Sequence, residues 1–366
     1  MATMDINTPR FFCDSVSSHL AKGSNTSSII TGTNLLDFQS GTISEISDGK
    51  PLNRVTFDTS SNTSKHILFN FDFATNRPVR RNFCAILNHN FNTSNARIRI
   101  AHSANSDRIN DIDFSAINTG SDYSWASNTC TEILNADTIA QASDDKSCLI
   151  TPGEDGSTIF TFPNTENFRY SGIQIEGATS FNGSTDVEFG CILLGTFYDM
   201  PHAPDVSLTR SILYDGVKVN QSIGGQKYGL ATNIGKFIVP SSAGTAQYPP
   251  FILSTSNEMH EFMGRQVYDL SFSFINRADL IPDKYTTHSD VNAGDNNNLT
   301  QRPFVMDVWN QTLGNMLPFI FCIDKDATGD DVEGEYMYAR FDTNELNMQQ
   351  VSNKLYNVKM KIIEEF

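Results

Sequence analysis

Positive charge is scarce in this sequence, and the shortage limits the partners that the chain can bind. The 366 residues include 26 Lys and Arg against 42 Asp and Glu, which gives a formal net charge of −16. Because nucleic-acid phosphates attract lysine and arginine, we expect no specific nucleic-acid binding. The excess of acid favours solubility through repulsion between molecules.

Long apolar runs are absent as well. No apolar stretch approaches the ~20 residues of a membrane-spanning helix. The start, "MATMDINTPRFFCDS", lacks the basic segment followed by an apolar one that a secretory signal has. We therefore expect synthesis in a cytoplasm and no membrane insertion.

Cysteines are few, and none is arranged as C-x-x-C. Several of the six stand inside apolar runs such as "FCAIL" and "GCILLG". This placement favours buried thiols in a reducing compartment. A disulfide between Cys130 and Cys148 remains open as an alternative.

Enzyme motifs fail at the places where the sequence comes closest to them. "HEFMG" at His260 begins like a zinc-protease helix, but Gly264 stands where the second histidine is needed. "GLATNIGKF" is one residue too long for a phosphate-binding loop, and Phe237 stands where that loop needs a hydroxyl. No G-x-S-x-G elbow of a serine hydrolase occurs. We predict no catalytic residues and no enzymatic activity.

Phenylalanine and uncharged polar residues are abundant, and their pattern predicts an all-β fold. The chain has 26 Phe and 11 Tyr, many of them in short segments bounded by Gly, Pro or Asn. Apolar residues occupy every second position in 67–73 and again in 356–362, which is the period of a half-buried strand. In "YDLSFSFI" the same alternation places Leu270, Phe272 and Phe274 on one face. Such a series of short strands is typical of a β-sandwich.

One segment has a helical period instead. Apolar residues recur at helical spacing across 305–316, between Pro303 and Pro318. We predict the main helix of the second half there, with Trp309 buried against neighbouring strands. "DMPHAPD", at 199–205, has two prolines in four residues and predicts a domain boundary.

One acidic loop matches the spacing of a calcium-binding loop. "DKDATGDDVEGE" places Asp324, Asp326, Gly329 and Glu335 at positions one, three, six and twelve. Thr328, at position five, also offers an oxygen. Because the flanks are strands rather than helices, the alternative is an acidic hairpin loop kept in water. Calcium is the one cofactor that the sequence suggests.

Three N-terminal stretches resemble a β-sandwich that recurs in structural proteins of tailed bacteriophages. They are "TPRFFCDSVSSHLAKG" near the start, "AILNHNFNTSNARIRIA" at 85–101 and "FRYSGIQIEGATSFNGSTDVEFGCILLGTFYD" at 168–199. That sandwich is similar to the galactose-binding, discoidin-like jelly roll. The C-terminal part, from "VWNQTLGNMLPFIFCID" onward, resembles the helix and closing strands of phage tail proteins built on the tail-tube fold.

The resemblance implies a domain order and a role. It implies an N-terminal arm at 1–30, a galactose-binding-like jelly-roll β-sandwich at 31–204, and a tail-tube-like β-barrel domain with one main helix at 205–366. The sandwich-first order differs from that of the usual distal tail protein. The implied role is a virion structural protein of the tail, assembled in the bacterial host cytoplasm. It would form a distal tail or tail-tip ring, expected to be a hexamer, connecting the tail tube to the hub or fibres.

The resemblance also leaves alternatives. Jelly rolls of this type bind sugars through aromatic and Asn or Asp residues in loops at one end, and "NTGSDYSWASN" at 118–128 offers Tyr123 and Trp125. The alternative function is therefore a receptor-recognition module of the tail that binds a host surface glycan. In the alternative structural interpretation Trp125 packs in a core. The remaining alternative functions are a depolymerase and a capsid-associated protein.

Overall fold

The computed structural model describes residues 8–22, 30–32, 36, 38–73, 81–103, 130–136, 138–141, 148–162, 169–214, 217–231, 251, 264–281, 303–327 and 335–365. These residues are mostly β-strand, and their strand pairings are antiparallel. The all-β class is confirmed. No helix within the described ranges is both long and apolar enough to cross a bilayer.

The largest sheet has 11 strands and contains residues from both halves of the chain. Its strands, in spatial order, are β15 (Thr209–Leu213), β18 (Arg265–Asn276), β22 (Leu355–Glu364), β20 (Tyr336–Phe341), β19 (Phe319–Cys322), β1 (Arg10–Asp14), β14 (Cys191–Asp199), β6 (Phe83–His89), β11 (Gly156–Thr161) and β8 (Thr131–Leu134), with β21 (Asn347–Ser352) paired to β22. In the described strands this sheet is open, with β15 at one end and β8 at the other. The predicted closure into a β-barrel is therefore absent from them, because no described strand joins the two ends.

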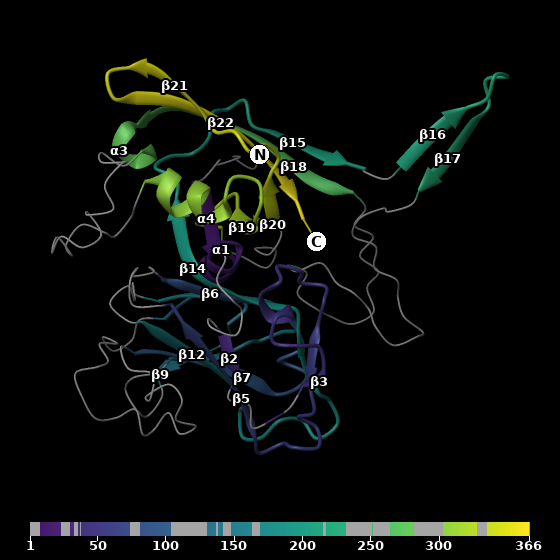
Figure 1. The fold of residues 1–366 in the computed structure, drawn as a ribbon, viewed down its shortest axis with the longest axis vertical. Coiled ribbons are helices and arrows are strands. Elements are labelled where there is room, and N and C mark those ends of the chain that lie inside the picture. The colour runs from purple at the N-terminus through teal and green to yellow at the C-terminus, as the bar shows by residue number, and fades with distance from the viewer. Residues whose placement is uncertain are drawn as a thin grey trace, which may run out of the picture.

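The smaller sheets lie in the first half, apart from one hairpin. The six-stranded sheet runs β2 (Ile30–Gly32), β5 (His66–Asp72), β12 (Tyr170–Gly177), β7 (Ala96–Ser103), β10 (Cys148–Thr151) and β9 (Thr138–Gln141). The three-stranded sheet runs β13 (Val187–Phe189), β4 (Val55–Phe57) and β3 (Phe38–Ser40). The hairpin consists of β16 (Val217–Gln221) and β17 (Lys227–Ala231). In Figure 1 this hairpin lies at the upper right and extends away from the other sheets.

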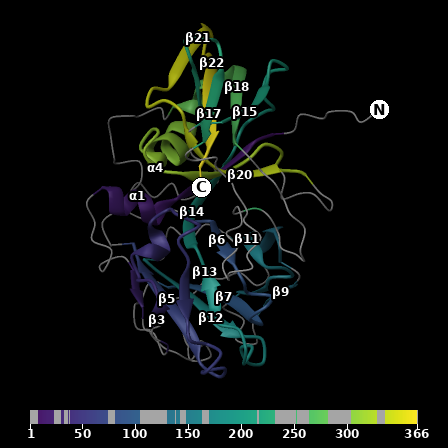
Figure 2. The same ribbon diagram turned by 90° about the vertical axis from the view of Figure 1, so that its right-hand side faces the viewer.

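The helical segments are short. They are α1 (Ser15–Ala21), the 3-10 helix η1 (Glu45–Ser47), α3 (Arg277–Leu280), the π-helix η5 (Val305–Trp309) and α4 (Asn310–Thr312). Figure 2 shows α1 and α4 on the same side of the molecule, one above the other, and they are in contact.

Strand β1 joins the two halves of the large sheet. One edge of β1 pairs with β14, with Phe12 opposite Phe197, and the other edge pairs with β19, with Phe12 opposite Ile320. Gly195 permits the close approach of β14, since a Cβ there would lie 2.0 Å from the carbonyl oxygen of Cys13. A strand near the start of the chain therefore holds together residues that lie far apart in sequence.

The large sheet is buried on both faces along much of its length. On one face, alternate residues of β6 and β14 pack against the six-stranded sheet in a core that includes Ile86, Ile192 and Phe69. Farther along the chain, that face of β14 presents Tyr198, which joins Phe11 in a second core beside η5. The opposite face forms a third core, to which β1 contributes Phe12. Successive side chains of β1 thus enter two different cores, as the strand period requires.

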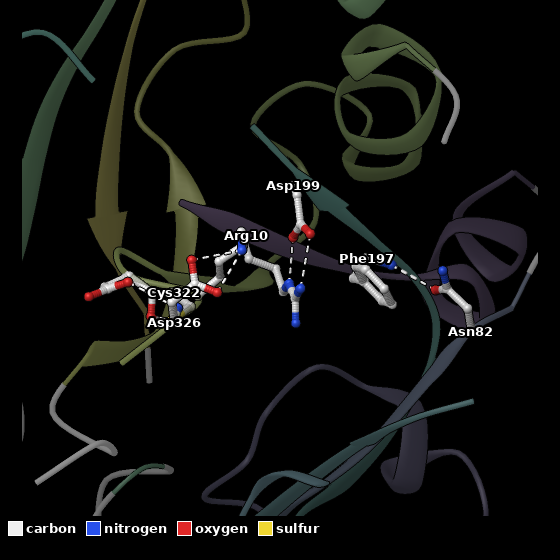
Figure 3. A network of polar contacts seen from close by, with 8 residues as sticks. Arg10, Asn82, Phe197, Asp199, Cys322 and Asp326 are labelled. Carbon is white, nitrogen blue, oxygen red and sulfur yellow. Dashed lines mark hydrogen bonds and ion pairs between the residues drawn. The ribbon is translucent and has the colours of Figure 1, made fainter. Parts of the chain in front are cut away.

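A polar fork fixes the beginning of β1 (Figure 3). The Arg10 guanidinium donates to both carboxylate oxygens of Asp199, with Nε–Oδ1 at 2.5 Å and Nη2–Oδ2 at 2.9 Å. It also lies 4.5 Å from the ring centre of Phe197. Burial lowers the pKa of Arg10, but the hydrogen bond and charge of Asp199 outweigh it and leave the pKa raised. Asn82 accepts from the Phe197 amide at 2.9 Å and secures the neighbouring part of β14.

The strand alternation predicted from sequence holds in β22. In β5 the alternate residues enter one core as predicted, but Leu68 and Asn70 on the other face are buried as well, so the strand is not half-buried. In β18 the alternation is wrong at one position. Leu270 and Phe272 are buried, whereas Phe274 is 64% exposed. Phe274 has a left-handed φ of 62°, and the pairing with β22 shifts between Phe272 and Ile275. The resulting bulge turns Ile275 into the core in place of Phe274.

The main helix of the second half lies where it was predicted but ends early. It enters at Pro303, whose carbonyl accepts from the amides of Met306 and Asp307, and α4 ends at Thr312. Leu313 has a left-handed φ of 53°, so the chain leaves the helix before Met316, which is 53% exposed.

The prediction for Trp309 is also only partly right. The indole is half-buried at the margin of the second core rather than fully buried. Its ring contact is with Phe341, at 5.1 Å between centroids. Phe341 lies on β20. Trp309 meets it at the margin of the core because the helix turns Val305 and Val308 toward the core instead.

The domain boundary predicted at 204/205 stays a prediction. Residues 8–22, which fall in the predicted N-terminal arm, form β1 and α1 inside the fold. Through β1, the large sheet is hydrogen-bonded continuously across the predicted boundary.

Replacing Phe11 tests the importance of β1. Phe11 is fully buried, and its ring centroid lies 5.2–5.6 Å from those of Phe304, Phe319 and Phe321. Phe11→Ala should lower the free energy of unfolding by about 3–5 kcal/mol because it leaves a cavity among these rings. The control Phe274→Ala removes an exposed ring and should cost less than about 1 kcal/mol. Denaturant unfolding measures both, and equal losses would contradict this account of β1.

Candidate functional site

Two buried ionisable groups, Asp14 and His89, hold elements of the fold together. Asp14 caps α1 by accepting from the amides of Val16 and Ser17, and it also accepts from the Leu194 amide at 2.9 Å. Burial raises the pKa of Asp14, against the lowering effect of these hydrogen bonds. Its carboxylate therefore joins α1 to β14, which fits a structural role.

His89 forms part of a second buried polar chain. Its Nδ1 accepts from the Phe91 amide at 3.3 Å, so Nε2 carries the proton and donates to Thr158 Oγ1 at 2.8 Å. The Thr158 hydroxyl in turn donates to the Asn135 carbonyl at 3.1 Å. Burial, aided by the positive charge of Arg54, lowers the pKa of His89 to about 3. The imidazole is therefore neutral and ties β6 to β11.

The asparagines beside His89 also hold strands together. Asn88 has a left-handed φ of 57°, accepts from Arg54 Nη2 at 2.6 Å and donates to the Pro51 carbonyl at 3.0 Å. Asn90 accepts from the Glu188 amide and donates to the Asp186 carbonyl. The Asn-rich turn that begins in "AILNHNFNTSNARIRIA" is thus a structural junction between β6, β13 and the chain around Pro51.

The six cysteines are free thiols, five of them buried and Cys130 half-buried. The Cys130 and Cys148 thiols are in hydrogen-bond contact, and burial together with this contact raises the pKa of Cys130. This contact brings together the two residues for which a disulfide was left open.

The predicted calcium loop is described only at its ends. Asp324 accepts from the Asp326 amide at 3.0 Å, and the Asp326 carboxylate is held by Lys325 Nζ at 2.6 and 2.8 Å. The Glu335 carbonyl accepts from the Ile323 amide at 3.2 Å. Thr328 lies outside the described residues. In the part of the chain that the structure does describe, no three His, Cys, Asp or Glu side chains form a metal-binding group. Calcium stays a prediction.

The predicted glycan residues, Tyr123 and Trp125, also lie outside the described residues. Their role stays a prediction for the same reason.

Exposed apolar side chains are concentrated in one part of the described surface. We call residues 206–214 and 217–231 the exposed arm. Nine large apolar residues in it are exposed: Val206, Ile212, Leu213, Tyr214, Val217, Val219, Ile223, Tyr228 and Leu230. In the remaining described residues the exposed large apolar side chains are Phe274, Met316 and Val351, which are far apart in sequence. This concentration makes the exposed arm the candidate functional site, because contiguous exposed apolar surface is typical of binding sites.

The exposed arm starts from a fixed base. Asp205 accepts from the Ser273 amide and hydroxyl at 3.2 and 2.8 Å, and its own amide donates to the Ser271 carbonyl. Strand β15 then pairs with β18 and forms one end of the large sheet. All five residues of β15 are exposed. The base of the arm is therefore part of the scaffold, and its outer edge lacks a partner strand among the described residues.

The hairpin at the end of the arm is exposed on both faces. Residues 217–230 are exposed throughout, and Ile223 stands at the turn. The pairing places Lys218, Leu230 and Tyr228 on one face, and Val217, Val219 and Lys227 on the other. A two-stranded hairpin is at best marginally stable alone in water. Apolar side chains are exposed on both faces of this hairpin, which is unusual for a solvated loop and makes it a candidate binding element.

The sequence interpretation missed this surface. The segment "SIGGQKYG" is Gly-rich and by itself indicates only a turn. The available signal was the pair of short alternating segments, "VKV" and "KYGL", on either side of that turn, which together predict a hairpin. Alternation alone does not show whether the apolar face of a hairpin is covered.

In comparisons with known proteins, no protein-family model, no curated protein and no solved structure matches this chain.

The buried, neutral His89 generates a pH prediction. Its pKa is about 3 when folded and about 6.5 when unfolded, so the unfolded chain binds more protons between these values. The contribution to stability is full above pH 6.5 and decreases as the pH falls, by about 1.4 kcal/mol per pH unit. Unfolding measured at pH 7 and pH 5 should show this loss, with a shallower loss in His89→Gln. An imidazole NMR signal of folded protein that titrates near pH 6.5 would contradict it.

Proposed function

We propose that this chain is a structural protein of a tailed-bacteriophage virion. In this proposal it forms a ring at the distal end of the tail or in the tail tip, and it connects the tail tube to the hub or fibres. It has no enzymatic activity, and its partners are further copies of itself and neighbouring tail proteins. The chain would be assembled in the host cytoplasm and function in the virion.

The observation that carries this proposal is the exposed arm. An apolar surface on a secured sheet edge, followed by a hairpin exposed on both faces, suits a protein that functions by contact with other proteins. Burying one such side chain is worth about 1.5–3 kcal/mol. Several of them on one arm could hold an assembly together.

The resemblance in sequence supports the more specific part of the proposal. The stretches that resemble the phage sandwich correspond to β1 with α1, to β6 and β7, and to β12, β13 and β14. These elements are largely buried. We propose that the two face-to-face sheets of the first half are the jelly roll, and that the second half is a tail-tube-like domain.

The position of the chain in a particle tests this proposal. Gold-labelled antibodies against the chain, applied to purified virions of the phage that encodes it, should mark the distal end of the tail in electron micrographs. Antibodies against a known capsid protein provide the control for labelling of the head. Label on the capsid alone, or virions whose mass spectra lack the chain, would contradict the proposal.

A further inference from the structure

We propose that the hairpin β16–β17 of one molecule binds an acidic surface of a second copy of this chain, head to tail. This inference rests on the proposed assembly role and names the partner and the geometry of the contact. It starts from the charge of the hairpin.

The hairpin is basic within an acidic molecule. Residues 217–231 contain Lys218 and Lys227 and no Asp or Glu, whereas the whole chain has a net charge of −16. Within the described residues neither lysine takes part in an ion pair. Another copy of the chain therefore offers the opposite charge that the hairpin lacks. Such complementarity steers association and selects the partner.

The same charges exclude a contact between two hairpins. A two-fold contact would bring the same patch of both molecules together. Each face of the hairpin carries one lysine and no carboxylate, so a lysine of one copy would then face the same lysine of the other. Like charges placed together in an interface oppose binding. The surface that receives the hairpin must lie elsewhere on the second copy.

A contact between two different patches has a geometric consequence. Each molecule donates one hairpin and receives one, so the contact repeats from copy to copy. It generates a closed ring when the rotation between neighbours closes, and an open filament when it does not. The ring of the proposed function is the closed case of this contact.

The apolar residues of the hairpin supply the binding energy. Val219 lies on one face and Leu230 on the other, and they are 61% and 58% exposed. Because both faces carry apolar side chains, the receiving surface should enclose the hairpin rather than touch one side of it. The exposed edges of β16 and β17 can also pair with a strand of the second copy.

A variant with a defective hairpin tests the proposal. In Val219→Asp/Leu230→Asp each face exchanges an apolar side chain for a carboxylate that offsets the charge of its lysine, while the exposed positions leave the fold intact. Sedimentation of the full chain should show oligomers for the unchanged protein and roughly tenfold or more weaker self-association for the variant. The matched control is Val351→Asp on β21, another exposed valine, which should assemble normally. An unchanged protein that stays monomeric at high concentration would overturn the proposal, as would equal effects of the variant and the control.

Mixing distinguishes the head-to-tail contact from a two-fold one. A tagged Val219→Asp/Leu230→Asp protein keeps its receiving surface and should capture the untagged, unchanged protein. It should capture far less of an untagged Lys218→Glu/Lys227→Glu protein, whose hairpin has the wrong charge. Failure to capture the unchanged protein would show that hairpin meets hairpin and would overturn the proposal.

A carbodiimide cross-linker then locates the receiving surface, because it joins lysines to carboxylates in direct contact. Lys218 or Lys227 should be joined to Asp or Glu of another molecule, and cross-links confined to one molecule would count against the contact. These results are separate from those of the virion experiment. Self-association through the hairpin without labelled virions refutes the proposed function alone, whereas labelled tails with a monomeric purified chain refute this inference alone.

Discussion

The insertion of β1 between β14 and β19 is the constraint on which the rest of the structure depends. Without β1 the large sheet would be two sheets, since β14 and β19 contact each other through it. The insertion is specified by chemistry at each position. Arg10 forms the fork with Asp199, Phe11 enters the second core, Phe12 enters the third, and Gly195 lets the backbones meet. Because successive residues serve different cores, a shift of register by one would bury the wrong side chains on both faces.

The exposed arm acquires its position from this scaffold. Strand β15 pairs with β18, and β18 continues through β22, β20 and β19 to β1. The base of the arm is therefore hydrogen-bonded, strand by strand, to the most buried part of the molecule. Edge strands with exposed apolar residues are usually a hazard, because they promote uncontrolled association. Here the two lysines of the hairpin restrict which surface can bind it, so that the same feature can direct a specific contact.

The sequence predicted the features that depend on neighbouring residues, above all the alternation of apolar side chains along strands. The alternation in β5 and β22 was sufficient to identify the side chains that enter a core, which are Ile67, Phe69 and Phe71 in the first core and Val358, Met360 and Ile362 in the second. The bulge at Phe274 was not predictable, since nothing in "YDLSFSFI" indicates a left-handed φ at a phenylalanine. The early end of the helix at Leu313 did have a local signal, because Gly314 follows with a φ of 69° and glycine commonly ends helices. At Phe274, by contrast, the tertiary structure imposes a backbone conformation that the residue does not favour by itself.

Long-range features lay beyond the sequence pattern. The segment "RFFCD" is a short apolar run, and its pairing with strands from both halves depends on residues far away in the chain. The exposure of the hairpin could not be predicted from the sequence either, because "VKV" has the pattern of a half-buried strand whether or not another element covers it. For the candidate site, the two lysines and the Gly-rich turn are present in the sequence, but the exposure of residues 217–230 is seen only in the structure.

Hydrogen exchange followed by mass spectrometry, at low and high protein concentration, tests most directly the claim that one β1-centred scaffold presents a free hairpin for assembly. We predict that the amides of β1, β14 and β19 exchange slowly and together at both concentrations. The amides of 217–231 should exchange rapidly in dilute protein and become protected when the concentration is raised. Rapid exchange of β1 while β14 stays protected, or a hairpin whose exchange rate does not depend on concentration, would contradict the account.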